Sequence, residues 1–166
     1  MKTIENLLAA FAGESQANRK YLAFAKKADE EGYPQIAKLF RGAAEAETVH
    51  AHAHLKAMDG IKSTEENLKT AIEGEAYEFN DMYPNFLKVA EQEDHKKAIA
   101  SFKFALAVEK VHHALYQKAL ESFKKGKDLP KEEIYICPIC GDTFVGDHPD
   151  KCPVCSAPSN KFVKIN

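Results

Sequence analysis

Residues 47–50 read E-T-V-H and residues 109–112 read E-K-V-H, so a glutamate and a histidine stand three positions apart at two places in the chain. Three residues correspond to about 300° of an α-helix, which puts both side chains of a pair on one face, about one turn apart. A carboxylate and an imidazole placed in this way can bind the same metal ion. The two segments therefore predict two helices that each contribute a Glu-x-x-His pair.

Two further segments offer carboxylates. Glu14 lies in the first predicted helix, and residues 75–78 read E-A-Y-E, which puts Glu75 and Glu78 on one face of another. Two helices that each give a glutamate and two that each give Glu-x-x-His form the ligand set of a two-iron or two-manganese carboxylate site in a four-helix bundle. The predicted ligands are Glu14, Glu47, His50, Glu75, Glu78, Glu109 and His112.

The spacing of these ligands repeats. Glu47 follows Glu14 by 33 positions (47 − 14) and Glu109 follows Glu75 by 34 (109 − 75), whereas Glu78 has no counterpart. A single glutamate is more often solvated than ligating. Here, however, small and apolar neighbours predict buried faces, where unpaired charges cost several kcal/mol. Two divalent cations would nearly neutralise the carboxylates.

Helix signals divide the first part of the chain. We expect helices over about 4–31 and 34–58, and a third that opens with the capping box Ser63-x-x-Glu66. Pro84 removes an amide donor and should kink or break that helix. The last helix is expected to begin near Asp94 and to end at Gly126.

Composition limits the partners. The 166 residues carry a net charge of −2 and no basic run, which argues against nucleic acid and against a membrane surface as partners. No apolar stretch is long enough to span a bilayer, and Glu5 and Asn6 interrupt the apolar run that a secretory signal needs. All four cysteines lie between 137 and 155. No cysteine is left for a disulfide elsewhere in the chain, which suits a reducing compartment, so we expect a cytoplasmic protein.

The composition changes after Gly126. Residues 127–133 are polar with a proline and predict a linker, and the 33 residues from 134 to 166 are too few to fold on a hydrophobic core alone. Cys137-Pro-Ile-Cys140 and Cys152-Pro-Val-Cys155 predict two knuckles around one tetrahedral metal ion, and the spacing alone does not separate zinc from iron. The predicted domains are thus 1–126 and 134–166.

The whole pattern resembles the rubrerythrin family. The resemblance covers nearly all of the chain and includes GESQANRKYLAFA, AEAETVHAHAHL, GEAYEFNDMYP, AVEKVHHALY, YICPICG and CPVC. Ferritins share the bundle but lack the cysteine tail. The resemblance implies a mainly α fold, in which a ferritin-like four-helix bundle precedes a small rubredoxin-like metal-knuckle domain with short strands.

Residue roles follow from the resemblance. The seven ligands would bind two irons with Glu47 and Glu109 as bridges, and on oxidation one iron would exchange His50 for Glu78. Tyr21 and Tyr83 match family tyrosines that hydrogen-bond to ligands. Together with His50 and Glu78 they are the expected catalytic residues. A third iron would be held by Cys137, Cys140, Cys152 and Cys155, a site that zinc can occupy in recombinant material.

The implied activity is an NADH-peroxidase type of reaction in oxidative-stress defence. Hydrogen peroxide would be reduced to water, with electrons passing through the cysteine-bound iron from rubredoxin or from a separate NAD(P)H-dependent reductase. Two alternatives stay open. One is a ferritin-like ferroxidase for iron storage, and the other is a zinc ribbon that binds a partner while the bundle is a scaffold.

The link between the second and third helices bears on assembly. A parallel arrangement of these helices requires the chain to cross about 38 Å, whereas the six residues 59–64 reach only about 20 Å. We expect a homodimer that exchanges helix hairpins, so that each di-iron site takes ligands from two chains. The short linker also suggests that the cysteine-bound iron lies near a partner's bundle and away from its own.

Overall fold

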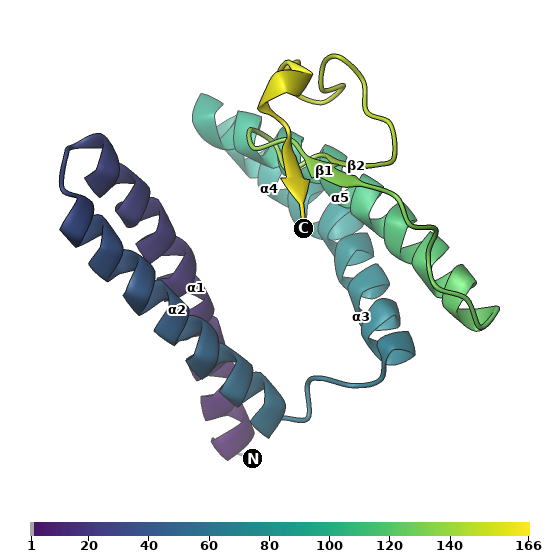
Figure 1. Ribbon diagram of the computed structural model, residues 1–166, viewed down its shortest axis with the longest axis horizontal. Helices are drawn as coiled ribbons and strands as arrows, with labels where there is room; N and C mark the ends of the chain where they lie inside the picture. The colour runs from purple at the N-terminus through teal and green to yellow at the C-terminus, as the bar shows by residue number, and fades with distance from the viewer. Residues whose placement is uncertain (1) are drawn as a thin grey trace. The chain divides into compact units, whose positions relative to one another are not determined.

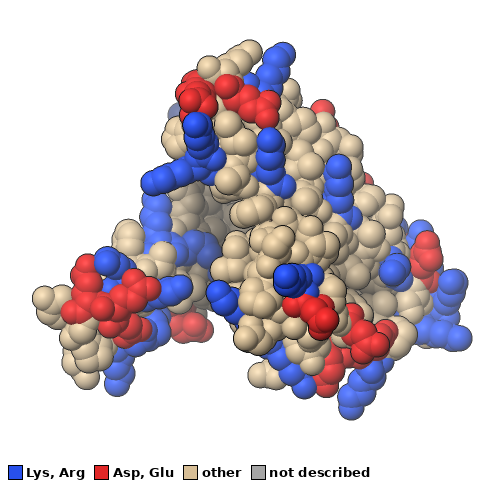
Figure 2. Space-filling view, turned by 90° about the horizontal axis from the view of Figure 1, so that it is seen from above, with Lys and Arg blue, Asp and Glu red and all other residues tan. Residues whose placement is uncertain are grey.

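The computed structural model describes residues 2–166. The chain divides into two compact units, an N-terminal unit that ends at Lys62 and a C-terminal unit that runs from Ser63 to Asn166. Helices dominate both, and within residues 2–166 none is long and apolar enough to cross a membrane. On the face drawn in Figure 2, basic and acidic side chains lie beside one another.

The N-terminal unit is a hairpin of α1 (Lys2–Glu30) and α2 (Pro34–Ala57), which lie side by side in Figure 1. Gly32 adopts a φ of 82° in the turn, a left-handed conformation that suits glycine, and Pro34 starts α2. Buried alanines line the contact between the helices: Ala25, Ala28, Ala37 and Ala44. These small side chains allow close approach, and Asn18 Nδ2 donates to Ala44 O at 2.7 Å.

The C-terminal unit begins with α3 (Thr64–Tyr77), and the predicted capping box is confirmed. Glu66 N–H donates to Ser63 Oγ at 3.3 Å, and Ser63 N–H donates to Glu66 Oε2 at 3.3 Å. Each bond satisfies an amide that the first helical turn leaves without an intrahelical partner.

The predicted kink or break at Pro84 takes the form of a π-helical turn just before the proline. A π-helical turn, labelled η1, spans Glu78–Met82 and leads directly into α4 (Tyr83–Gln92). Tyr83 N–H donates to Glu78 O, five residues back, and Pro84 lies in the first turn of α4, where proline is tolerated. The π turn thus absorbs the interruption.

The last helix, α5 (Lys96–Lys124), packs against α3, η1 and α4. It starts two residues later than Asp94, which has a φ of 49° and ends the preceding turn. His95 is the N-cap residue, and its Nδ1 accepts a hydrogen bond from Ala98 N–H at 3.3 Å. The predicted helix beginning near Asp94 is therefore correct to within the cap.

A three-stranded antiparallel sheet follows, with β1 (Ile134–Ile136) between β2 (Thr143–Val145) and β3 (Val163–Ile165). Its small core contains the buried Cys137, Cys152 and Ala157, with Phe144 and Phe162 stacked at 4.8 Å between ring centroids. So few apolar residues require the additional constraint of the knuckles.

The cysteine segment (residues 134–166) packs against α5 of its own chain. β2 contacts α5, and a Cβ built on Gly141 would lie 3.8 Å from Val108 Cγ1, a buried α5 side chain. This contact differs from the expectation that the cysteine-bound iron lies away from its own bundle. Residues 125–133 extend far enough to return the chain along α5.

Candidate metal centres

The N-terminal half-site consists of Glu14 on α1 with Glu47 and His50 on α2. One candidate donor atom from each residue lies within 4.8 Å of the others, and His50 Nδ1 is 3.0 Å from Glu47 Oε2. The alanine contact between the helices brings Glu14 opposite the Glu-x-x-His pair. In the single chain the Glu47 side chain is 18% exposed and that of His50 is 56% exposed.

The C-terminal half-site has the same composition: Glu75 on α3 with Glu109 and His112 on α5. His112 Nδ1 lies 2.8 Å from Glu109 Oε2 and 3.9 Å from Glu75 Oε1. This half-site is more enclosed, because the His112 side chain is 29% exposed and that of Glu75 is 18% exposed. Two glutamates and one histidine suit iron, zinc or manganese.

Each carboxylate of the C-terminal half-site makes ionisation of its neighbours less favourable. Desolvation, a hydrogen bond with Glu109 and the charges of Glu109 and Glu78 raise the pKa of Glu75 to about 7. Desolvation, followed by the charge of Glu109, raises the pKa of Glu78, and the nearby His112 opposes that shift. A divalent cation at this position would relieve the repulsion, so the donor set fits a metal on electrostatic grounds as well.

Glu78 lies beside this half-site and is not one of its three clustered residues. It is the first residue of η1, where the helical phase changes. The charges of Glu109 and His112 act on its pKa, so Glu78 lies near the same cluster. A carboxylate on a π turn next to three potential ligands is well placed to approach or leave a metal.

The two predicted tyrosines differ in their surroundings. Desolvation and the charges of Glu78, Glu109 and Glu75, in that order, raise the pKa of Tyr83, so it borders the carboxylate cluster. Its ring packs on Phe102 at 6.1 Å. Tyr21 packs on Phe40 at 6.2 Å within the N-terminal hairpin. Within the described residues of that hairpin, no hydrogen bond joins the Tyr21 hydroxyl to Glu14.

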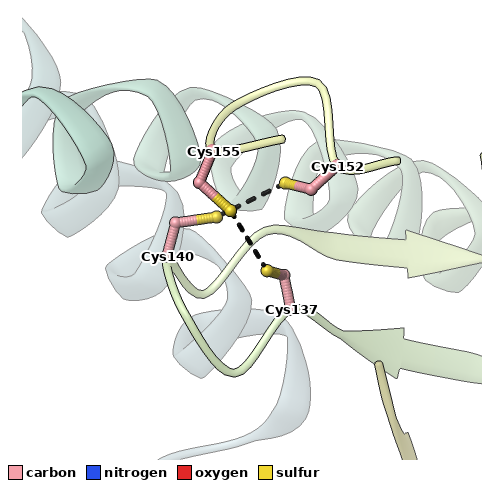
Figure 3. A group of neighbouring side chains, drawn as sticks. All are labelled: Cys137, Cys140, Cys152 and Cys155. Atoms are coloured by element: carbon pink, nitrogen blue, oxygen red, sulfur yellow. Dashed lines mark hydrogen bonds between the residues drawn. The ribbon is translucent and has the colours of Figure 1, made fainter. Parts of the chain in front are cut away.

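The four cysteines converge from two loops (Figure 3), and their sulfurs lie within 4.8 Å of one another. Cys137 Sγ is 3.5 Å from Cys155 Sγ, and Cys140 Sγ is 3.5 Å from Cys152 Sγ, distances too long for disulfides. Burial raises the pKa of Cys140 and of Cys152. The arrangement is that of a tetrahedral S₄ metal site.

Backbone amides support these sulfurs. Burial acts to raise the pKa of Cys137, but hydrogen bonds from the N–H groups of Ile139 and Cys140, together with those of the Cys155 and Cys140 side chains, leave that pKa below its ordinary value. Amides of Val154 and Cys155 act in the same direction on Cys152. Donors aimed at the sulfurs stabilise thiolates, which is the form that binds a metal.

Two residues near the metal centres escaped sequence analysis. Asp142 is 2% exposed, and its Oδ2 accepts from Cys152 Sγ at 3.5 Å. Thr143 Oγ1 lies 3.0 Å from His112 Nε2, across 31 positions of sequence. No periodicity connects a helix to a strand in another part of the chain, so the sequence offers no signal for this contact.

Comparisons with known proteins agree with this architecture. A family model described as rubrerythrin matches residues 5–120, and a model described as the rubredoxin-like domain of rubrerythrin matches residues 135–163. Rubrerythrin-2 of Clostridium acetobutylicum is 35% identical across 96% of this chain and 95% of its own length. Nigerythrin of Nitratidesulfovibrio vulgaris is 38% identical across 96% of this chain and 85% of its own.

A solved structure also matches. Nigerythrin in its fully reduced, all-ferrous state aligns with 98% of this chain and 86% of its own, with a TM-score of 0.59 and 37% identity. Together with the rubredoxin-like match, this likeness confirms the predicted fold class: mainly α, ferritin-like, with a small rubredoxin-like domain.

Proposed function

Because the chain belongs to the rubrerythrin family, we propose that it is a non-haem di-iron peroxidase that reduces hydrogen peroxide to water. The balanced reaction adds two electrons and two protons to peroxide and gives two water molecules. A pair of ferrous ions in the bundle would supply one electron each, which allows O–O cleavage without release of a radical. The side chains of the bundle would bind these ions and donate hydrogen bonds to the ligands.

The proposal assigns each ligand a task. Glu14, Glu47 and His50 would hold one side of the iron pair, and Glu75, Glu109 and His112 the other, with Glu47 and Glu109 as bridges. Glu78 would replace His50 on one iron as the pair is oxidised. The high exposure of His50 and the position of Glu78 on the π turn support this exchange. Tyr83 and Tyr21 would each donate a hydrogen bond to a ligating carboxylate, and Tyr83 borders the carboxylate cluster.

One observation carries the proposal: the C-terminal half-site and the cysteine site share a single compact unit and touch. Thr143, three residues after Cys140, contacts the half-site ligand His112. An iron held by Cys137, Cys140, Cys152 and Cys155 could therefore pass single electrons to the bundle over a short path. Rubredoxin or an NAD(P)H-dependent reductase would supply them, in the cytoplasm, where thiols stay reduced. The domains carrying these sites would be 1–126 and 134–166, joined by 127–133.

We also propose a homodimer with exchanged hairpins. Three of the seven proposed ligands lie in the N-terminal unit and four in the C-terminal unit, so neither unit holds the whole set. Only residues 58–63 connect α2 to α3, and they reach about 20 Å when extended, less than the length of either helix of the hairpin. A second chain could supply the missing hairpin without any crossing of the bundle.

The visible absorption spectrum, measured together with metal content, tests the activity. Anaerobically iron-loaded protein should be red, bleach with dithionite and regain its colour on addition of stoichiometric peroxide, with water as product. Zinc-loaded recombinant material is colourless, so metal analysis must accompany the spectrum. Iron-loaded protein that recolours rapidly with oxygen but not with peroxide, and that assembles into iron-storing cages, would favour the ferroxidase alternative instead.

A further inference from the structure

A hydrogen bond joins the two metal centres of the C-terminal unit. His112 Nε2, on α5, is 3.0 Å from Thr143 Oγ1, on β2. The other ring nitrogen, Nδ1, faces the carboxylates of Glu109 and Glu75 at 2.8 and 3.9 Å. The imidazole is therefore held at both ends, by the metal half-site on one side and by the cysteine segment on the other.

The number of hydrogens on the Thr143 hydroxyl determines which atom donates in this bond. A threonine hydroxyl has one hydrogen to donate and accepts through its lone pairs. Thr143 Oγ1 donates that hydrogen to Gly141 O at 3.1 Å, because a carbonyl can only accept. Its bond with His112 must therefore run from Nε2–H to Oγ1. Nδ1 is then the ring nitrogen that can bind a cation beside Glu109, where the cation would replace the hydrogen between Nδ1 and Glu109 Oε2.

The N-terminal half-site lacks this support within its own unit. His50 Nδ1 meets Glu47 in the same way, but among residues 2–61 no hydrogen bond to His50 Nε2 is present. The His50 side chain is 56% exposed and that of His112 is 29% exposed. Half-sites of equal composition are therefore unequally anchored.

The knuckle holds Thr143 in place. Gly141 N–H donates to Cys137 O and Cys137 N–H donates to Asp142 O, both at 2.8 Å, and Thr143 pairs with Ile136 in the sheet. This turn contains two of the four cysteines, and a segment of this size depends on its metal for order. Loss of the cysteine-bound ion would therefore release the Thr143 hydroxyl.

We infer that Thr143 is a positioning residue that fixes the Nε2–H tautomer of His112 and thereby makes metal binding at the C-terminal half-site depend on the occupied cysteine site. Partners of the outer nitrogen of a ligating histidine typically contribute 10–100-fold to metal affinity or activity. The inference deepens the proposed function and rests on it only in that the half-site binds a metal.

Binding of Mn²⁺ to the full-length protein, with its cysteine site loaded, tests this role. Manganese prefers oxygen and nitrogen ligands to thiolates, and free Mn²⁺ is counted by electron paramagnetic resonance. Thr143→Val, which keeps the shape and removes the hydroxyl, should weaken binding about 10-fold or more. Thr143→Ser should restore it, and Thr70→Val, on the exposed face of α3, should leave it unchanged.

Nitrogen-15 NMR of the histidines gives a readout that does not depend on activity. In the wild-type protein His112 should keep its Nε2–H signal, and Thr143→Val should shift or broaden it while the spectrum of the cysteine-bound iron stays the same. Wild-type Mn²⁺ affinity in Thr143→Val, or weak binding in Thr143→Ser as well, would overturn the role of the hydroxyl. Failure of the wild type to bind any metal would instead overturn the proposed function.

The dependence on the cysteine site has its own test. Cys155→Ser removes a cysteine ligand, and we expect it to weaken Mn²⁺ binding about as much as Thr143→Val does. The double variant should lose no more than either single variant, because both changes act through one contact. Additive losses, or full affinity in Cys155→Ser, would contradict the coupling.

Discussion

At the scale of single residues, Glu75 shows most clearly what the metal contributes to stability. Its carboxyl is desolvated, shares a hydrogen bond with Glu109 and lies near the charge of Glu78, and these effects raise its pKa to about 7. A glutamate in the unfolded chain titrates near 4.5, so without a cation the folded protein binds the proton more tightly than the unfolded protein does.

The sign of the pH dependence follows. Between the unfolded pKa and about 7 the folded state binds more protons, so the free energy of unfolding decreases as pH rises through this window. We predict that metal-free protein is more stable against urea at pH 5 than at pH 7.5. Saturating Mn²⁺ should reduce or reverse this dependence.

Glu75→Gln provides the control for that prediction. The amide cannot ionise, so the variant should lose most of the decrease in stability between pH 5 and 7.5. Exposed Glu73→Gln, on the same helix, should retain it. An equal slope in the wild type and in Glu75→Gln would show that other groups carry the pH dependence.

Glu78 supports a second prediction at this scale. Glu78→Gln keeps the size of the side chain but removes the negative charge that would replace His50 on the oxidised metal pair. Peroxide reduction should slow about 10-fold or more, as for other groups that tune a metal site. Peroxide-dependent recolouring in stopped flow measures this step, with Glu73→Gln as the matched control. A normal rate would argue against the exchange.

At the scale of elements, the start of α3 has a measurable role. Ser63 and Glu66 satisfy each other's backbone amides there. Ser63→Ala should destabilise the C-terminal unit by about 1 kcal/mol, a typical cost for loss of an N-cap. Thermal unfolding followed by circular dichroism should show a lower midpoint. Ser101→Ala, on the exposed face of α5, should be neutral or slightly stabilising because alanine favours helices.

Local patterns allowed much of this architecture to be predicted. The capping box at Ser63 and the Cys-x-x-Cys spacing of the two knuckles depend only on neighbours in sequence, and each appears in the structure. The backbone conformation around Pro84 could not be predicted from neighbouring residues. A missing amide can be accommodated by a break, a kink or a π turn, and the packing of η1 against α5 decides among them.

The candidate sites also combine features that local sequence patterns predict with contacts that they do not. Helical periodicity placed each Glu-x-x-His pair on one face, and the structure brings each pair together with one glutamate of the other helix in its hairpin. The contact of Thr143 with His112 depends on where a short sheet docks on a helix. No local sequence pattern encodes that docking, so the contact could not be predicted from the sequence.

At the scale of the whole molecule, the division into two units governs how a two-iron site can form. The N-terminal unit contributes two glutamates and one histidine and the C-terminal unit three glutamates and one histidine, and six residues connect α2 to α3. A site from a single chain and a site shared between two chains use the same side chains. The two arrangements give different results when one chain carries a substitution in its N-terminal half-site and a second chain carries one in its C-terminal half-site.

Complementation between inactive chains distinguishes them. Glu47→Ala disables the N-terminal half-site and Glu109→Ala disables the C-terminal one. In an exchanged dimer that pairs one chain of each kind, one site receives both defects and the other receives none, so roughly half of the wild-type peroxidase activity should return. With sites built within single chains, every site carries one defect and no activity returns. Differently tagged chains, co-expressed and purified through both tags, provide the mixed dimer, and each homodimer alone is the control.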